Sequence, residues 1–181
     1  AKLLGMDTPE QIIFTQNCTQ AVNIAIKGCI ERGDHIIISS LEHNAVSRPV
    51  YALAAAGIAE YDIAQVDIQN EEQTVENFKR LIRPNTRLIC CVHGSNVFGT
   101  LQPVARLAKM AHDAGAFFLL DAAQTAGIVE INVQEIEADF ICMAAHKGLY
   151  APTALGILAV VGNMPLHTIL EGGSGVLSLE E

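Results

Sequence analysis

Residues 87–121 read RLICCVHGSNVFGTLQPVARLAKMAHDAGAFFLLD. Two short runs that are rich in apolar side chains, 87–92 and 116–120, flank a longer stretch in which apolar side chains recur at helical spacing. Pro103 suits the first turn of that helix, and Gly115 suits its end. A strand that is apolar on both faces must be covered on both, and a helical connection leads the chain back to a parallel strand. The stretch therefore predicts a strand–helix–strand unit of a parallel sheet.

The same alternation extends over the rest of the chain. Strands are expected over residues 11–14, 35–39, 60–66, 87–92, 116–120, 139–143 and 155–161. Helices are expected over residues 19–31, 44–56, 71–82 and 103–115, with Thr19 as the N-cap of the first. Only residues 148–154 separate the last two strands, which is too short for a parallel crossover, so the seventh strand is predicted to be antiparallel. The expected fold is an α/β three-layer αβα sandwich around a mainly parallel seven-stranded sheet.

Composition restricts the class of protein. The chain has 181 residues, of which half are apolar and 17% are charged, so disorder is excluded and a single domain is expected. Its 11 basic and 20 acidic residues include no basic cluster, which argues against nucleic acid or an anionic membrane as partner. The apolar runs are far shorter than the roughly 20 residues of a membrane-spanning helix. No targeting peptide is visible. The first residue is not Met, so the ends are not expected to be natural ones.

The five cysteines form an odd set without a C-x-x-C pair, and most of them lie inside apolar runs. This usage is typical of reduced, buried thiols in a cytosolic protein, and no metal site is expected. A cytoplasmic location follows as an expectation.

Polar side chains follow five of the expected strands. They are Asn17, Cys18, Thr19 and Gln20; Glu42, His43 and Asn44; Ser95 and Asn96; Asp121 and Gln124; and His146 with Lys147. In open α/β sheets, ligands bind outside the carboxyl ends of the strands. The sequence therefore predicts one ligand site at that edge of the sheet.

Three of these positions have a specific chemistry. Residues 15–20 present hydroxyls and free N–H groups at a helix start, which favours a phosphate, although a plain N-cap is the alternative. Asp121 ends a buried strand and needs a cationic or hydrogen-bonding partner, for which a structural cap would also serve. Lys147 follows a buried strand rather than lying on a polar helix face, so it is a candidate for Schiff-base formation, the alternative being a surface lysine.

Two histidines lie at the same edge. His43 could stack on a planar ligand, and His146, next to Lys147, could donate a hydrogen bond to a phosphate. For each of them a purely structural role is the alternative.

Taken together, these positions resemble the class V pyridoxal-phosphate enzymes, most closely the cysteine desulfurase and selenocysteine lyase group. The resemblance covers nearly the whole chain and is carried by FTQNCTQAVN (14–23), EHN (42–44), SNVFGT (95–100), DAAQ (121–124) and AHKGLYAP (145–152). It implies that residues 1–181 are an incomplete aspartate aminotransferase-like large domain that binds pyridoxal 5'-phosphate. The family's N-terminal segment and C-terminal small domain are expected to be absent.

The resemblance also implies roles for individual residues. Lys147 would form the Schiff base and move the substrate's α-proton, and it and His43 would be the catalytic residues. The remaining cofactor contacts divide among ring nitrogen, ring face, phenolic oxygen and phosphate. They would be made by Asp121 (nitrogen), His43 (ring face), Asn96 and Gln124 (phenolic oxygen), and Thr19, the backbone of Gln20 and His146 (phosphate).

Two departures from the family pattern qualify this expectation. Ala144 stands where the family often has a phosphate-binding Ser or Thr, so cofactor affinity is expected to be lower. The nucleophilic cysteine and the substrate-binding arginine lie in the family beyond the point corresponding to residue 181. None of the five cysteines matches the nucleophile, and Cys18 is expected to pack rather than react.

The expected activity is that of a cysteine desulfurase, which converts L-cysteine to L-alanine and an enzyme-bound persulfide, with little or no turnover by this chain alone. The alternatives are a selenocysteine lyase or another class V lyase or aminotransferase, and a non-catalytic pyridoxal-phosphate-binding scaffold. A nucleotide-binding domain is disfavoured because no glycine-rich phosphate loop follows the first strand. The expected partners are a second copy in a homodimer, with Gly172–Gly175 near the interface and Ser174 reaching a phosphate across it, and a sulfur-acceptor protein.

Overall fold

The structure is a computed structural model that describes residues 1–162, 164 and 166–170. The expected role of Gly172–Gly175 and Ser174 at a subunit interface therefore lies outside the described residues. Among the residues that are described, no helix is long and apolar enough to cross a membrane.

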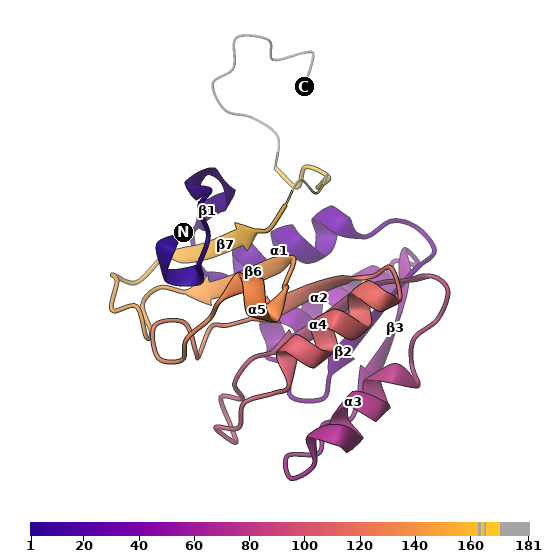
Figure 1. The fold of residues 1–181 in the computed structure, drawn as a ribbon. Coiled ribbons are helices and arrows are strands. Elements are labelled where there is room, and N and C mark those ends of the chain that lie inside the picture. The colour runs from indigo at the N-terminus through magenta and orange to yellow at the C-terminus, as the bar shows by residue number, and fades with distance from the viewer. Residues whose placement is uncertain (163, 165, 171–181) are drawn as a thin grey trace.

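The described chain forms one seven-stranded sheet (Figure 1). Its strands are β1 (Ile12–Thr15), β2 (Asp34–Ser39), β3 (Ala59–Ala64), β4 (Thr86–Val92), β5 (Phe117–Asp121), β6 (Phe140–Ala144) and β7 (Gly156–Val160). They are arranged in the order β1-β7-β6-β5-β4-β2-β3, and β7 pairs antiparallel with both of its neighbours while the other pairs are parallel. All seven predicted strands and the antiparallel direction of β7 are confirmed.

Helices cover both faces of this sheet, as the three-layer prediction requires (Figure 1). They are α1 (Cys18–Cys29), α2 (Asn44–Ala55), α3 (Glu71–Lys79), α4 (Val104–Asp113) and α5 (Val133–Ile136), with short 3-10 turns at Lys2–Leu4 and Pro9–Gln11. The side chains of α1 and α2 pack into one buried cluster, and those of α3, α4 and α5 pack into the other. The sequence did not predict α5, because four residues are too few for a helical period to be recognised.

Strand β4 shows how the sheet separates the two cores. Leu88 and Cys90 face the cluster under α1 and α2, whereas Ile89 and Cys91 face the cluster under α4. Successive side chains of a strand point to opposite faces, so a run that is apolar throughout is buried on both. The five cysteines are all free and buried, as predicted.

The N-cap of α1 is Asn17 and not Thr19 as predicted. Asn17 has an extended backbone, and its Oδ1 accepts a hydrogen bond from the Gln20 N–H at 2.8 Å. Thr19 lies inside the first turn of the helix. Both residue types cap helices, and the one preceding Cys18 has the extended conformation that a cap needs.

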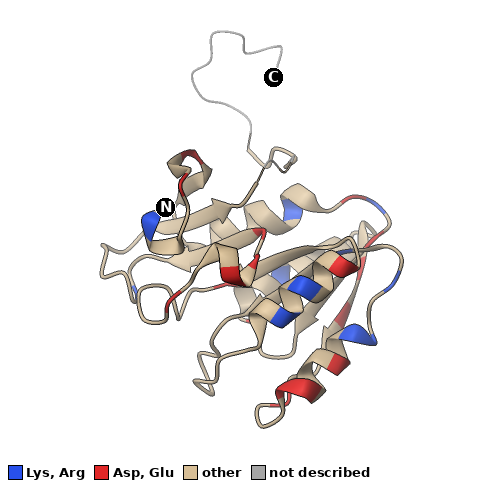
Figure 2. Cartoon of the chain, in the orientation of Figure 1, with Lys and Arg blue, Asp and Glu red and all other residues tan. Residues whose placement is uncertain are grey.

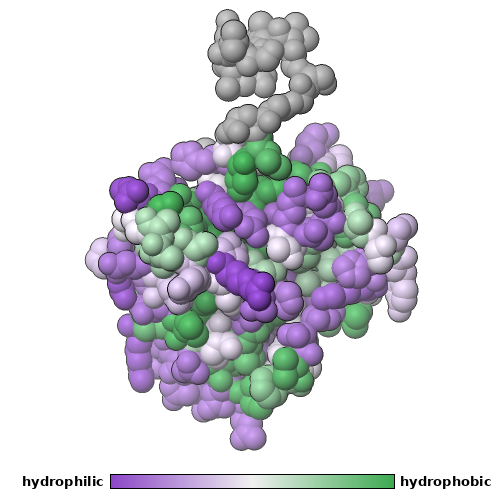
Figure 3. Space-filling view, turned by 180° about the vertical axis from the view of Figure 1, so that it is seen from behind, coloured by the Kyte–Doolittle hydropathy of each residue, from purple (hydrophilic) through white to green (hydrophobic). Residues whose placement is uncertain are grey.

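The surface carries dispersed charge and several exposed apolar side chains. Figure 2 shows Lys and Arg residues scattered among acidic ones on the outer helices, where Arg106 of α4 pairs with Glu72 of α3 at 2.7 Å. On the opposite side of the molecule, apolar side chains form separate patches between polar ones (Figure 3). The most exposed large apolar side chains include Phe14, Val97 and Tyr150.

Candidate functional site

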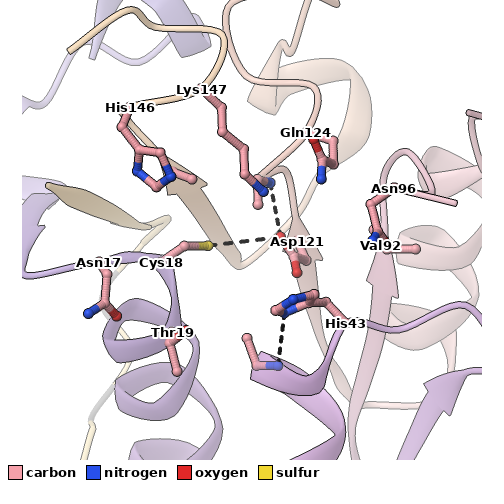
Figure 4. A pocket seen from close by; sticks show the side chains of 13 residues that line it. Asn17, Cys18, Thr19, His43, Val92, Asn96, Asp121, Gln124, His146 and Lys147 are labelled. Atoms are coloured by element: carbon pink, nitrogen blue, oxygen red, sulfur yellow. Dashed lines mark hydrogen bonds between the residues drawn. The ribbon is translucent and has the colours of Figure 1, made fainter. Parts of the chain in front are cut away.

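The carboxyl ends of β1, β2, β4, β5 and β6 lie at one edge of the sheet and surround a cavity of about 200 Å³ (Figure 4). The residues that line it come from the segments that directly follow those strands. They are Asn17, Cys18, Thr19, His43, Ala45, Val92, Asn96, Asp121, Ala123, Gln124, Ala144, His146 and Lys147. Side chains that are up to 130 positions apart in the sequence thus meet in one place, because parallel strands end at the same edge.

Of the eight residues to which the sequence assigned a cofactor contact, seven line this cavity. The exception is Gln20, whose backbone N–H donates to Asn17 Oδ1 and whose side chain accepts a hydrogen bond from the Gln16 N–H at 2.7 Å. Gln20 therefore helps to shape the start of α1 and does not face the cavity. Asn17, which was expected at this edge without an assigned contact, also lines the cavity, as do Ala123 and Val92, which the sequence did not single out. Glu42, Asn44 and Ser95 were expected at the same edge but do not line it.

Asp121 lies at the base of the cavity, at the end of β5, and is only 2% exposed. Its Oδ1 accepts hydrogen bonds from the Ala123 N–H at 2.9 Å and from the Cys18 thiol at 3.9 Å. Burial raises the pKa of Asp121, and the Ala123 N–H, His43 and Lys147 oppose that rise. Because both hydrogen bonds reach Oδ1, Oδ2 is left to accept from a donor in the cavity. A cationic N–H group placed there would offset the cost of burying the carboxylate.

His43 is the N-cap of α2, and its ring faces the cavity (Figure 4). Its Nδ1 accepts a hydrogen bond from the Ala45 N–H at 3.1 Å. A ring nitrogen that accepts carries no proton, so in the neutral ring the proton is on Nε2. The cap thus fixes both the orientation and the tautomer of this side chain.

Lys147 and His146 follow β6 in a tight turn. The Lys147 N–H donates to the Ala144 carbonyl at 3.2 Å, and the side chain is half-buried over the cavity. The Lys147 amino group makes no hydrogen bond or ion pair with any of the described residues. The residue after Lys147 must be a glycine, because a Cβ at Gly148 would overlap the Ala126 carbonyl oxygen. This close packing holds the turn that presents Lys147.

The start of α1 forms the side of the cavity next to His146 (Figure 4). Thr19 is exposed there and its hydroxyl makes no hydrogen bond within the described chain. Ala144 contributes only a methyl group to the same wall, as the sequence indicated. N–H groups at a helix start together with hydroxyl and imidazole donors are suited to an anionic group such as a phosphate.

Cys18 contacts Asp121 but is a poor nucleophile. Burial raises the pKa of its thiol far above the usual range, and the neighbouring carboxylate of Asp121 adds to this rise. The thiolate is the reactive form of cysteine, so Cys18 is suited to packing and to donating a weak hydrogen bond.

Comparisons with known proteins identify the class that this fold and site define. The family model of aminotransferase class-V matches residues 1–179, and the chain belongs to this family of pyridoxal-phosphate enzymes. The relatives that it resembles are cysteine desulfurases. It is 35% identical over 179 residues to the cysteine desulfurase IscS of Dictyoglomus turgidum, covering 96% of this chain and 44% of that protein.

Other relatives agree with this placement. A probable cysteine desulfurase of Synechocystis is 35% identical over 162 residues, covering 87% of this chain and 38% of that protein. Among solved structures, the cysteine desulfurase CsdA from Escherichia coli superposes with a TM-score of 0.81 at 29% identity, covering 88% of this chain and 41% of that one. The apo cysteine desulfurase from Thermococcus onnurineus has a TM-score of 0.79 at 32% identity, with 88% and 40% covered. The chain therefore spans less than half the length of these relatives.

Proposed function

We propose that this chain is the cofactor-binding large domain of a cysteine desulfurase and that its cavity binds pyridoxal 5'-phosphate. The observation that carries the proposal is the arrangement of Asp121 and Lys147. A buried carboxylate with one oxygen open to the cavity lies below a lysine whose amino group has no partner within the described chain. This pair is suited to a ligand that has a cationic ring nitrogen at one end and an aldehyde near the other.

The lining residues fit that cofactor on three further sides. The ring of His43 lies where it can stack on an aromatic ring, and Asn96 and Gln124 lie on the side where a phenolic oxygen would accept hydrogen bonds. Thr19 and His146 are the donors for the phosphate. The backbone of Gln20 fits this role less well than the sequence suggested, because its N–H is occupied by Asn17.

The cofactor, when bound, supplies a Schiff-base linkage and an electron sink for the substrate's Cα carbanion. Two residues of this chain would act on the cofactor ring and on the α-proton. Asp121 would hold the proton on the ring nitrogen, since a buried carboxylate strongly favours a neighbouring cation. Lys147 Nζ would take the α-proton and return it, which a half-buried amine on a rigid turn can do.

We propose L-cysteine as the substrate, with L-alanine and a persulfide as products, because the similar proteins are desulfurases. The five cysteines are buried, and where burial raises a thiol's pKa the nucleophilic thiolate is disfavoured. The persulfide-forming cysteine is therefore not expected among them, and the chain alone is expected to show little turnover. A cofactor-binding scaffold without turnover is the second candidate, and the same burial favours it.

Absorption spectroscopy tests the cofactor assignment. Titrating the purified chain with pyridoxal phosphate should produce a saturable visible band, and Lys147→Ala should lack it. Lys109→Ala is the matched control, because Lys109 lies on the surface of α4, where it pairs with Asp113. A Lys147→Ala variant with an unchanged spectrum would contradict the proposal.

Product analysis tests the reaction. With L-cysteine and a thiol reductant added to the cofactor-loaded chain, we expect alanine and sulfide to remain near background. Rapid release of both would mean that one of the buried cysteines, or no cysteine of the enzyme, accepts the sulfur.

A further inference from the structure

Glu42 precedes His43 in the turn between β2 and α2, and its carboxyl group faces inward without lining the cavity. Its Oε1 accepts two hydrogen bonds, from the Ser39 hydroxyl at 2.6 Å and from the Val92 N–H at 2.7 Å. Its Oε2 is shielded from solvent and has no hydrogen-bond partner in the described part of the chain. A buried carboxyl group with a specific pair of donors is thus held beside the cavity.

The Val92 N–H would be unpaired without Glu42. Strand β2 pairs with β4 only as far as Ile38 and Cys90, so β4 continues past the end of its neighbour. The N–H of the following residue, His93, donates to the Asp121 carbonyl of β5 at 2.9 Å. Consecutive N–H groups of a strand point to opposite sides, so the Val92 N–H points to where β2 has ended. Glu42 Oε1 supplies the acceptor that the sheet lacks there.

The same bond connects two walls of the cavity. Val92 lines the cavity and is the strand partner of Asp121, while Glu42 is joined through the main chain to His43. We propose that Glu42 is a positioning residue. The hydrogen bond from the Val92 N–H to its Oε1 holds the β2–α2 turn against the end of β4 and thereby sets the position of the His43 ring relative to Asp121. This inference rests on the proposed function, which assigns His43 and Asp121 to the cofactor ring.

The role needs an acceptor and not a charge. Both donors reach one oxygen, and an amide oxygen can accept both in the same place. Burial raises the pKa of Glu42 to about 8, so the carboxyl group is largely neutral near pH 7. Glu42→Gln should therefore preserve the positioning, and Glu42→Ala should remove it.

Amide hydrogen exchange tests this on the chain alone. In Glu42→Ala, exchange at the Val92 N–H should accelerate by about tenfold or more relative to Ile89 in the same strand, because the amide has lost its acceptor. In Glu42→Gln, and in the exposed control Glu130→Ala, the ratio of the exchange rates at Val92 and Ile89 should stay as in the unmodified chain. An unchanged ratio in Glu42→Ala would overturn the proposal, and so would equal acceleration at Val92 and Ile89, which indicates general destabilisation.

Cofactor binding tests the consequence for the site. We expect Glu42→Ala to weaken pyridoxal phosphate binding by about tenfold and to reduce its induced visible circular dichroism, with Glu42→Gln within about threefold of the unmodified chain. Equal affinities for Glu42→Ala and the unmodified chain would overturn the role, as would a Glu42→Gln variant as weak as Glu42→Ala. If the unmodified chain binds no cofactor, the proposed function fails, and the exchange at Val92 still decides whether Glu42 ties the turn to β4.

Discussion

At the scale of single residues, the site depends on how Asp121 is buried. Its Oδ1 accepts hydrogen bonds from the Ala123 N–H and the Cys18 thiol, so its Oδ2 is left to accept from a donor in the cavity. Asp121→Asn retains the size of the side chain and its bond from Ala123 but removes the charge that would pair with a ring N–H.

We predict that Asp121→Asn weakens pyridoxal phosphate binding by roughly 10- to 100-fold, because a charge-assisted hydrogen bond becomes a neutral one. The unliganded variant should be at least as stable as the unmodified chain near pH 8, since it no longer buries a carboxylate. Fluorescence titration and urea denaturation measure the two effects. Unchanged affinity would show that Asp121 does not face the ring nitrogen.

Glu42 gives the unliganded chain a pH dependence. Its pKa is about 8 in the folded chain, because of burial, and its ordinary value is 4.5. Between these values the folded state binds a proton that the unfolded state lacks, so the free energy of unfolding falls as pH rises, by up to about 1.4 kcal/mol per pH unit for one proton.

Glu42→Gln should therefore lose less stability between pH 5 and pH 8 than the unmodified chain does. Urea denaturation at several pH values measures this, with Glu130→Gln, an exposed glutamate, as control. Parallel curves for Glu42→Gln and the unmodified chain would mean that the Glu42 carboxyl titrates alike in both states.

At the scale of elements, the position of α1 depends on a glycine in β7. A Cβ at Gly156 would overlap the Asn17 backbone and approach the Thr15 hydroxyl, so only glycine lets the start of α1 pass this close to β7. Asn17 caps α1 at that point.

Gly156→Ala should lower the free energy of unfolding by roughly 3 kcal/mol through overpacking against the backbone. The control is Gly57→Ala, where no atom lies within 4 Å and the cost is that of a left-handed residue, about 1 kcal/mol. Chemical denaturation compares them. Equal losses in the two variants would refute the steric argument.

The sequence was informative about elements because the strands are apolar on both faces, so runs such as 87–92 and 116–120 stand out. The polar residues that follow the strands pointed to the cavity, because parallel strands end at the same edge of the sheet. The sequence could not predict that Asn17 would be the cap in place of Thr19, or that Gln20 would face away, because both depend on where the extended backbone ends. Nor did it reveal the bond from Glu42 to Val92, which depends on β4 extending past β2.

At the scale of the whole molecule, a group of exposed apolar side chains is a candidate contact surface. Val97, Phe98 and Leu101 lie close together in the sequence beside the cavity residue Asn96, and each is at least half exposed. Clustered apolar side chains on a soluble surface mark contact sites.

We predict that the 19.4 kDa chain self-associates. Light scattering over a range of concentrations should give a mass that rises above that of one chain, and Val97→Ser with Phe98→Ser should reduce the rise. A constant mass of one chain at all concentrations would contradict this.

We propose that Lys147 is the residue that bonds covalently to pyridoxal phosphate. Borohydride reduction of the cofactor-treated chain, followed by peptide mass mapping, tests it most directly, because the chain has four other lysines as internal controls. We predict a single stoichiometric adduct on the peptide that contains Lys147. An adduct spread over Lys2, Lys27, Lys79 and Lys109, or one that persists in Lys147→Ala, would contradict the assignment of Lys147.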